Sequence, residues 1–395
     1  MNYPRAVEDV RAFVLYEYKD RPTVYAIGSI DRDRFIEVDE TRKDVILYAI
    51  SLMDGKRSFE DIDKRISVDK GVIIKTEELY NTLKKADLLF EQGSQGVIKS
   101  EFETLGLKVF EISLKGLKKL FRSLSVLTVP LYLLTLLVLL FAAFFAAFNY
   151  SSITVGSLFG FTDSYLKNII ITILIMFFSI LCHEFSHAIV ASKYGIIPRK
   201  LTLSLYLYIS PIVYIKLPGL YTIKPRERIL VWGSGITTNM LFACIGLVFT
   251  VLLKKHGVSE SIISIVNRFW YINGVLAIVN MCPLMPLDGY FMLATTLKIP
   301  NLRRGAFKAL KTSVGSKRIR FSVGQFLYFV LSILLMGMVV GKEILSMISI
   351  FVYNTKDGVL SAFWSIRQYA LFGILIIILA TVKRIKGRNA YRAHE

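Results

Sequence analysis

Residues 167–192 read KNIIITILIMFFSILCHEFSHAIVAS, an apolar run that is interrupted near its end by two histidines and a glutamate. The run exceeds the ~20 residues that a helix needs to cross ~30 Å of hydrocarbon. On a helix, His183 and His187 share one face because they are four residues apart. Two such imidazoles can bind one Zn²⁺, and Glu184 beside them can take a proton from water at the metal. Since an ionisable group in hydrocarbon costs at least ~2.5–3.5 kcal/mol, we interpret this cluster as a metal site rather than as packing.

Five further apolar runs have the length of membrane spans. Hydrophobic residues make up 54% of the 395 residues, more than in an ordinary soluble domain. The six predicted spans are 124–148, 167–192, 229–253, 269–297, 321–341 and 361–382. The run 344–353 is too short to cross and is expected at the membrane surface. The sequence therefore predicts a polytopic α-helical membrane protein with about six spans.

The basic residues indicate which segments face the cytoplasm. The formal net charge is +19, and residues 101–395 hold 32 Lys or Arg against 11 Asp or Glu, whereas residues 1–100 hold 17 against 19. Basic clusters lie before the first span and after the second, fourth and sixth, which predicts that those segments are cytoplasmic. We therefore expect a multi-pass protein of the cell membrane with both termini in the cytoplasm. The slightly acidic balance of residues 1–100 argues against nucleic-acid binding.

Residues 1–100 have the pattern of a small soluble α/β domain. Strands are expected at 12–27, as a pair joined by a turn, and at 35–38, and helices at 44–53, 58–66 and 76–88. Residues 101–122 alternate basic and apolar side chains, which predicts an interfacial linker on the membrane surface. Residues 123–395 would then form the membrane domain.

Residues 199–218 read RKLTLSLYLYISPIVYIKLP and differ from the other apolar segments. They alternate with a period of two, and Pro211 lies in the middle. The pattern favours a pair of strands or a re-entrant hairpin over a seventh span. Since unpaired strand edges are not tolerated in lipid, this segment must lie against protein or line a cavity.

A third metal ligand is expected at Asp288. A catalytic zinc site takes three protein ligands and keeps one position open. Asp288 follows Pro283 and Pro286 and precedes Gly289, and these residues break the helix within the apolar run 269–297. Helix breaks at membrane depth free backbone groups that normally face a cavity or a site.

Two asparagines are candidates for contact with a substrate. Asn239 follows the glycines of Gly233-Ser234-Gly235 in the third span, and Asn280 directly precedes the helix break. Either amide can hold a substrate backbone or stabilise an oxyanion. The alternative is that each amide bonds to a neighbouring backbone group.

Three motifs together resemble the site-2 protease family of intramembrane zinc metalloproteases. Within residues 167–297 they are His183-Glu184-Phe185-Ser186-His187, Gly235-x-x-x-Asn239 and Asn280-x-x-Pro283-x-x-Pro286-Leu287-Asp288-Gly289. The resemblance implies three zinc ligands (His183, His187 and Asp288), a catalytic base (Glu184) and two substrate contacts (Asn239 and Asn280). The sequence departs from the family at Ile236, where proline is common, and at Tyr290, where a second glycine is common. Neither departure removes a ligand.

Residues 1–92 resemble, more weakly, the PqqD-like winged-helix domains that bind leader segments of ribosomally made, modified peptides. The resemblance rests on Asp39-Glu40-Thr41, on Asp54-Gly55-Lys56-Arg57-Ser58 and on Ala86-Asp87-Leu88-Leu89. It implies a peptide substrate bound through residues 1–100, with a peptide-modifying enzyme or a transporter as a further partner. The alternative is a soluble domain with a regulatory or packing role.

We therefore expect a zinc metalloendopeptidase that cuts peptide bonds near or within the lipid bilayer and matures a modified peptide. One alternative is a peptide-export or immunity membrane protein that does not cleave, although such a protein would not need a base at Glu184. Another is a regulatory protease that cuts a membrane-anchored signalling protein, which the lack of a PDZ-like insertion between the spans disfavours.

Overall fold

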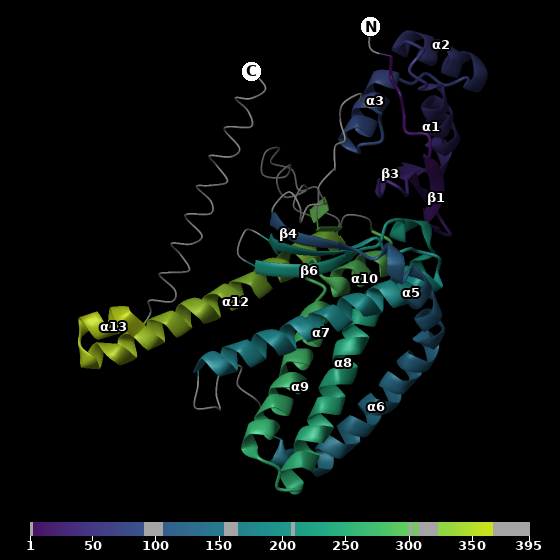
Figure 1. Ribbon diagram of the computed structural model, residues 1–395. Coiled ribbons are helices and arrows are strands. Elements are labelled where there is room, and N and C mark those ends of the chain that lie inside the picture. The colour runs from purple at the N-terminus through teal and green to yellow at the C-terminus, as the bar shows by residue number, and fades with distance from the viewer. Residues whose placement is uncertain are drawn as a thin grey trace. The chain divides into compact units, whose positions relative to one another are not determined.

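The computed structural model describes residues 3–90, 106–153, 165–206, 210–299, 302–303, 305–306 and 323–365. The chain forms two units. The first unit holds Met1–Lys99, Glu111–Thr202 and Val213–Ile299, and it contains all six predicted site residues. The second unit holds Ser100–Phe110, Leu203–Ile212 and Pro300–Glu395. Figure 1 shows the ribbon with its elements labelled.

The N-terminal part of the first unit is a three-stranded sheet followed by three helices. Its strands are β1 (Arg11–Tyr16), β2 (Val24–Ser29) and β3 (Arg34–Asp39), and its helices are α1 (Glu40–Leu52), α2 (Phe59–Lys70) and α3 (Thr76–Lys85). The strands are antiparallel in the order β1-β2-β3. Ile27, Ile62 and Leu83 are fully buried in one hydrophobic core. The strands and helices predicted for this part of the chain are confirmed.

Local signals explain where α2 begins and ends. Ser58 Oγ accepts a hydrogen bond from the Asp61 N–H at 3.2 Å, and the Asp61 carboxylate accepts one from the Ser58 N–H at 3.4 Å. These reciprocal bonds satisfy N–H groups that a helix leaves free at its first turn. The helix continues past the predicted end at residue 66 until Gly71, whose φ of 65° suits glycine at a helix end.

A second sheet contains β4 (Gly106–Ser113), β5 (Lys200–Tyr206) and β6 (Ser210–Lys216), in that order. The strand pair expected within residues 199–218 is therefore confirmed. The expectation of a simple interfacial linker at 101–122 was incomplete, because its residues 106–113 form β4. Alternation of basic and apolar side chains has the period of a strand, and pairing with β5 satisfies the backbone of both strands.

Four helices among the described residues are long and apolar enough to cross a membrane: Lys115–Phe148, Lys167–Lys193, Pro225–Lys255 and Glu260–Met281. The first comprises short 3-10 turns, α5 (Lys118–Leu124) and α6 (Thr128–Phe148), and it begins earlier than the predicted 124. The others are α7 (Tyr165–Lys193), α8 (Pro225–Lys255) and α9 (Glu260–Met281). These helices correspond to the first four predicted spans.

The fourth predicted span, 269–297, is wrong in its bounds. Helix α9 begins at Glu260 and ends at Met281, and a separate helix α10 (Asp288–Thr296) follows the break. The earlier start reflects Arg268, which is buried in the helix and donates to the Asn168 carbonyl oxygen at 3.0 Å and to Thr172 Oγ1 at 3.1 Å. Hydrogen-bond partners on α7 thus allow Arg268 to be buried within α9, whereas the sequence alone placed this charged residue in a loop.

The second unit contains α12 (Val323–Asn354) and α13 (Val359–Ser365). Helix α12 covers residues 323–341 of the predicted span 321–341 and also the run 344–353, so the prediction of a separate surface segment at 344–353 was wrong. The sixth predicted span, 361–382, begins in α13, and its remainder from residue 366 lies outside the described residues.

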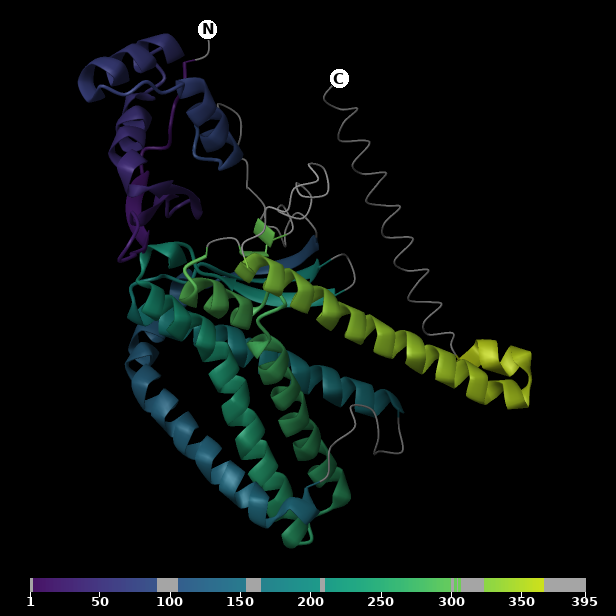
Figure 2. The ribbon, with the colours of Figure 1, turned by 180° about the vertical axis from the view of Figure 1, so that it is seen from behind.

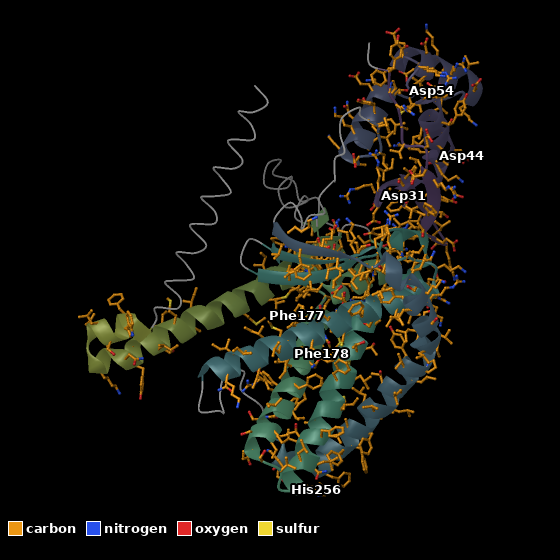
Figure 3. The ribbon with its side chains drawn as sticks, viewed as in Figure 1. Asp31, Asp44, Asp54, Phe177, Phe178 and His256 are labelled. Carbon is orange, nitrogen blue, oxygen red and sulfur yellow. The ribbon has the colours of Figure 1, made fainter. Side chains whose placement is uncertain are left out.

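The helices of the first unit pack around α8. Helix α8 contacts α6, α7, α9 and α10. Figures 1 and 2 show α6, α8 and α9 running alongside one another, with α7 crossing them. Figure 3 labels Phe177 and Phe178 on α7 and His256 in the turn after α8. Large apolar side chains such as Leu137, Phe178 and Phe249 are more than half exposed, as contact with lipid requires.

Candidate metal centre

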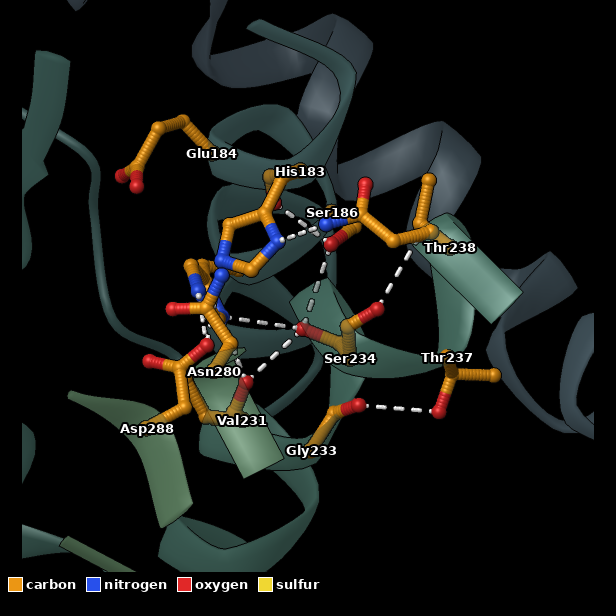
Figure 4. A network of polar contacts seen from close by, with 12 residues as sticks. His183, Glu184, Ser186, Val231, Gly233, Ser234, Thr237, Thr238, Asn280 and Asp288 are labelled. Carbon is orange, nitrogen blue, oxygen red and sulfur yellow. Dashed lines mark hydrogen bonds and ion pairs between the residues drawn. The ribbon is translucent and has the colours of Figure 1, made fainter. Parts of the chain in front are cut away.

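The structure brings the three predicted ligands together. His183 and His187 lie one turn apart on α7, and Asp288 is the first residue of α10. Asp288 Oδ2 lies 3.0 Å from His183 Nε2 and 3.3 Å from His187 Nε2. All three residues are buried, with 5–8% of their surface exposed, and their ligand atoms lie within 4.8 Å of one another. Figure 4 shows Asp288 facing the His183 ring. The cluster could hold a metal ion.

The helix break places Asp288 in this cluster. After α9 ends at Met281, the chain turns through two prolines before α10 begins. Gly289 permits the close return, since a Cβ atom on it would lie 2.3 Å from the Met281 carbonyl oxygen. The start of α10 can therefore lie directly against the end of α9, and Asp288 reaches the two histidines.

The surroundings of His187 determine which of its nitrogens is free. His187 Nδ1 lies 2.7 Å from the Val231 carbonyl oxygen and 3.1 Å from Ser234 Oγ, both on α8. A carbonyl oxygen can only accept, so Nδ1 carries the proton and donates it. In the neutral ring, Nε2 then presents a lone pair to Asp288 Oδ2. A nitrogen lone pair and a carboxylate oxygen 3.3 Å apart repel each other unless a proton or a metal ion lies between them, and a carbonyl-bound Nδ1 is the usual support of a histidine that binds metal.

Asp288 Oδ2 is buried and has no hydrogen-bond partner among the described residues, although the two imidazole Nε2 atoms lie 3.0 Å and 3.3 Å from it. An unsatisfied buried carboxylate oxygen is costly. Two imidazole nitrogens and one carboxylate oxygen form a ligand set that zinc accepts, although other divalent ions accept it too. The residues therefore fit a divalent metal ion held by three protein ligands.

Gly235 allows α8 to approach His183. A Cβ atom on Gly235 would lie 2.4 Å from His183 Cε1 and from His183 Nε2, which no pair of real atoms tolerates. The glycine in the predicted Gly-x-x-x-Asn motif therefore makes room for a ligand, rather than only allowing helices to pack.

We predict that Gly235→Ala lowers zinc affinity by about 10–100-fold, the cost of disturbing the support of a ligand. The new methyl group must displace the His183 ring or push α8 away from α7. The matched control is Gly233→Ala, whose Cβ would meet only Met292, at 3.7 Å or more. Zinc affinity is measured by competition with a chelator. Equal affinities of the two variants would show that the contact at Gly235 does not matter.

Glu184 is half-buried beside the ligands, but its hydrogen bond points elsewhere. Its Oε2 accepts a hydrogen bond from the Ile215 N–H of β6 at 3.0 Å. Figure 4 shows its carboxylate apart from the ligand atoms. The structure thus places the expected base next to His183 in the chain and ties it to the second sheet. Its role as a base stays a prediction.

The two asparagines differ in position. Asn239 is fully buried, and its amide nitrogen lies 3.0 Å from His183 Nδ1. Asn280 is partly exposed, and its amide donates to the Leu276 carbonyl oxygen on its own helix at 3.0 Å. Figure 4 draws Asn280 in one view with His183 and Asp288. Of the two asparagines, only Asn280 has exposed surface, and its contact with a substrate stays a prediction.

Sequence reasoning missed the supports of the ligands. Val231 binds His187 through its backbone carbonyl, and Ile215 binds Glu184 through its backbone N–H. Because nearly any residue could make these backbone contacts, the side chains at 231 and 215 do not indicate them. Ser234 stands inside the predicted motif but was not singled out. The spacing of four between Gly235 and Asn239 was the one available signal, since it places both residues on one face of α8.

The structure brings the three motifs that resemble the site-2 protease family to one place in the first unit. His183 and His187 meet Asp288 of the third motif, and the middle motif supports them from α8. Membership of that family stays a prediction. No protein-family model, no curated protein and no solved structure matches this chain.

Proposed function

We propose that this protein is a zinc-dependent membrane endopeptidase that cleaves peptide bonds near or within the membrane. The observation that carries the proposal is the convergence of His183, His187 and Asp288 on one point, with His187 Nδ1 bound to the Val231 carbonyl oxygen and Nε2 3.3 Å from a buried carboxylate oxygen. This ligand set leaves room for a reactant, as a catalytic rather than a structural zinc site does.

The residues around the site support hydrolysis. Zinc held by these ligands would supply Lewis-acid polarisation of a peptide carbonyl and of water. Glu184 takes a proton from the attacking water and passes it to the amine that leaves, so the peptide bond breaks and the elements of water are added. The Ile215 N–H binds Glu184 Oε2, which leaves Oε1 to carry that proton. Asn280 holds the substrate backbone from the end of α9.

Peptide cleavage in ¹⁸O-labelled water tests the proposal. The purified protein is incubated with a peptide library made from the host's own proteome, and the products are read by mass spectrometry. We expect new carboxyl termini that carry ¹⁸O in the zinc-loaded protein, and none after chelation. Absence of labelled termini under both conditions, from a protein shown to bind peptide, would favour a non-cleaving export or immunity protein.

We further propose six spans with both termini in the cytoplasm. The four long apolar helices of the first unit support the first four spans, the apolar α12 supports the fifth, and the basic loops set the direction. The sixth span rests on the sequence, because residues from 366 lie outside the described part of the chain. Reporter fusions at Ser157 and Lys356 should read outside, and fusions at Arg199 and Gly305 should read inside. An outside signal at Gly305 would overturn this topology.

Residues of the N-terminal domain contact segments that adjoin the site. Within the first unit, Asp33 Oδ1 accepts from the Gly219 N–H at 2.9 Å, and Arg228 donates to the Leu15 carbonyl oxygen at 2.6 Å. Gly219 follows β6, and Arg228 lies three residues before Val231 on α8. Burial raises the pKa of the Asp33 carboxyl, and the bond from Gly219 opposes that rise. The domain thus contacts the segment after β6, the strand whose Ile215 N–H binds Glu184. It also contacts the start of α8, the helix whose Val231 carbonyl binds His187.

Tyr18 makes a further contact, with the segment that follows α10, the helix of the third predicted ligand. Its hydroxyl donates to the Lys298 carbonyl oxygen at 2.6 Å, and Lys298 follows α10, the helix that begins at Asp288. We propose that the domain binds a leader segment of a genetically encoded peptide by pairing with an open sheet edge, and that it presents this peptide to the metal site. Tethering raises the local concentration of the peptide without tight binding at the zinc.

We predict that deleting residues 1–100 slows cleavage of the native peptide at low concentration far more than at saturation. The domain can be tested alone, because its core lies entirely within residues 6–89. Residues 1–100 should bind the leader peptide in calorimetry, and a scrambled peptide should not bind. If the domain binds no peptide encoded beside this protein, and its deletion leaves native cleavage unchanged, the recognition role is wrong while the protease proposal stands.

A further inference from the structure

One face of α8 supports both histidines. Val231, Gly235 and Asn239 recur every fourth residue and therefore lie along one stripe of the helix. His187 contacts Val231 at one end of the stripe, and His183 contacts Asn239 at the other. The order is reversed between the helices, so α7 and α8 are antiparallel here. Gly235, in the middle, gives the His183 ring its space.

The position of Asn239 does not support the substrate contact that was predicted for it. Its side chain is fully buried, so a substrate at the metal cannot reach it without displacing His183. An amide in the interior of an apolar helix bundle is costly unless it is hydrogen-bonded. Its contact is with His183 Nδ1 at 3.0 Å, and its Oδ1 has no hydrogen-bond partner among the described residues.

The chemistry of imidazole links this contact to the metal. A neutral histidine carries one proton, and a ring that binds metal through Nε2 must carry it on Nδ1. That N–H needs an acceptor. Turning the Asn239 amide by 180° exchanges its nitrogen and oxygen with little change in shape. Oδ1 then accepts from His183 Nδ1, and the amide nitrogen takes the position in which Oδ1 has no partner.

We infer that Asn239 is a positioning residue of the metal centre, which holds His183 in the tautomer whose Nε2 lone pair faces the metal. This inference rests on the proposed zinc site and assigns Asn239 to a ligand rather than to substrate. Asn239 does for His183 what the Val231 carbonyl does for His187. The difference is that a side chain can be replaced, so the support of one ligand can be removed on its own.

Three variants test the assignment. Asn239→Leu keeps the branch at Cγ and the number of side-chain heavy atoms and removes the acceptor, so we expect zinc affinity to fall by about 10–100-fold, as losses of such supports do. Asn239→Asp keeps an acceptor in place and should stay within a few-fold of the wild type. Thr238→Val is the matched control on the same helix turn, because the Thr238 hydroxyl bonds only to the Ser234 carbonyl oxygen of its own helix, at 3.0 Å.

The readouts are the zinc dissociation constant by chelator competition and the visible spectrum of the Co²⁺-loaded protein, which reports ligand geometry. We expect a changed Co²⁺ spectrum in Asn239→Leu and wild-type spectra in Asn239→Asp and Thr238→Val. Wild-type affinity and spectrum in Asn239→Leu would overturn the assignment and leave the metal site intact. If Asn239→Leu does not fold, weak binding by a folded Asn239→Asp overturns it equally. A wild-type protein that binds neither metal would refute the zinc site itself.

Discussion

We expect that replacing Glu184 by Gln leaves zinc bound and abolishes peptide hydrolysis. Gln has almost the same shape and can still accept the hydrogen bond from the Ile215 N–H. It cannot take a proton, however, and loss of a general base costs ~10²–10⁴-fold in rate. Zinc content and cleavage rate are measured on the same preparation, so that loss of activity is separated from loss of metal.

The control for this variant is Glu260→Gln, an exposed acid in the first turn of α9 that contacts no ligand. It should retain both zinc and activity. The Glu184→Gln protein should also retain substrate that it cannot cut, and mass spectrometry of the co-purified peptide would name the substrate class. A Glu184→Gln protein that cleaves at the wild-type rate would refute the mechanism. Among the described residues, the one carboxylate in the metal-binding cluster is Asp288, and it serves as a ligand.

We expect that replacing Asp288 by Ala removes zinc. Two histidines alone leave the site one protein ligand short of the three that catalytic zinc requires. The loss of affinity should exceed the ~10–100-fold seen when only a supporting contact is removed. The buried histidines also lose the carboxylate oxygen that lies 3.0 Å and 3.3 Å from their Nε2 atoms. Metal analysis after dialysis against a weak chelator measures the effect.

Asp288→Glu distinguishes ligation from general electrostatics. Its longer side chain keeps the charge and moves the oxygen atoms, so we expect zinc to bind while activity falls. Unchanged zinc content and activity in Asp288→Ala would show that Asp288 is not a ligand. Gly289 must stay in both variants, since any Cβ there would collide with the Met281 carbonyl.

The parts of the site that follow helix or strand periodicity could be predicted from the sequence. His183 and His187 share a face because of the 3.6-residue turn, and the pair of prolines before Asp288 does break the helix. Ser58 and Asp61 start α2 through a bond pattern that depends on neighbouring residues only. The strands β5 and β6 follow from alternation. All of these features are local.

The features that could not be predicted depend on partners far away in the chain. The start of α9 depends on Arg268 finding Asn168 on α7, a partner one hundred residues away. The burial of Asn239 against His183 depends on how closely α7 and α8 approach each other. Gly235 allows this close approach, but a glycine in the sequence does not by itself predict it. The Ile215 N–H that binds Glu184 belongs to a backbone, and every non-proline residue carries one.

X-ray absorption at the zinc edge tests the central claim most directly, because it reports the ligands of the metal in the intact protein. We predict one zinc per chain with two imidazole nitrogens at ~2.0–2.1 Å and oxygen ligands completing the shell. His183→Ala should remove one imidazole from the spectrum. A protein that takes up no zinc, or zinc whose spectrum shows no imidazole, would contradict the assignment of His183, His187 and Asp288 as the metal centre.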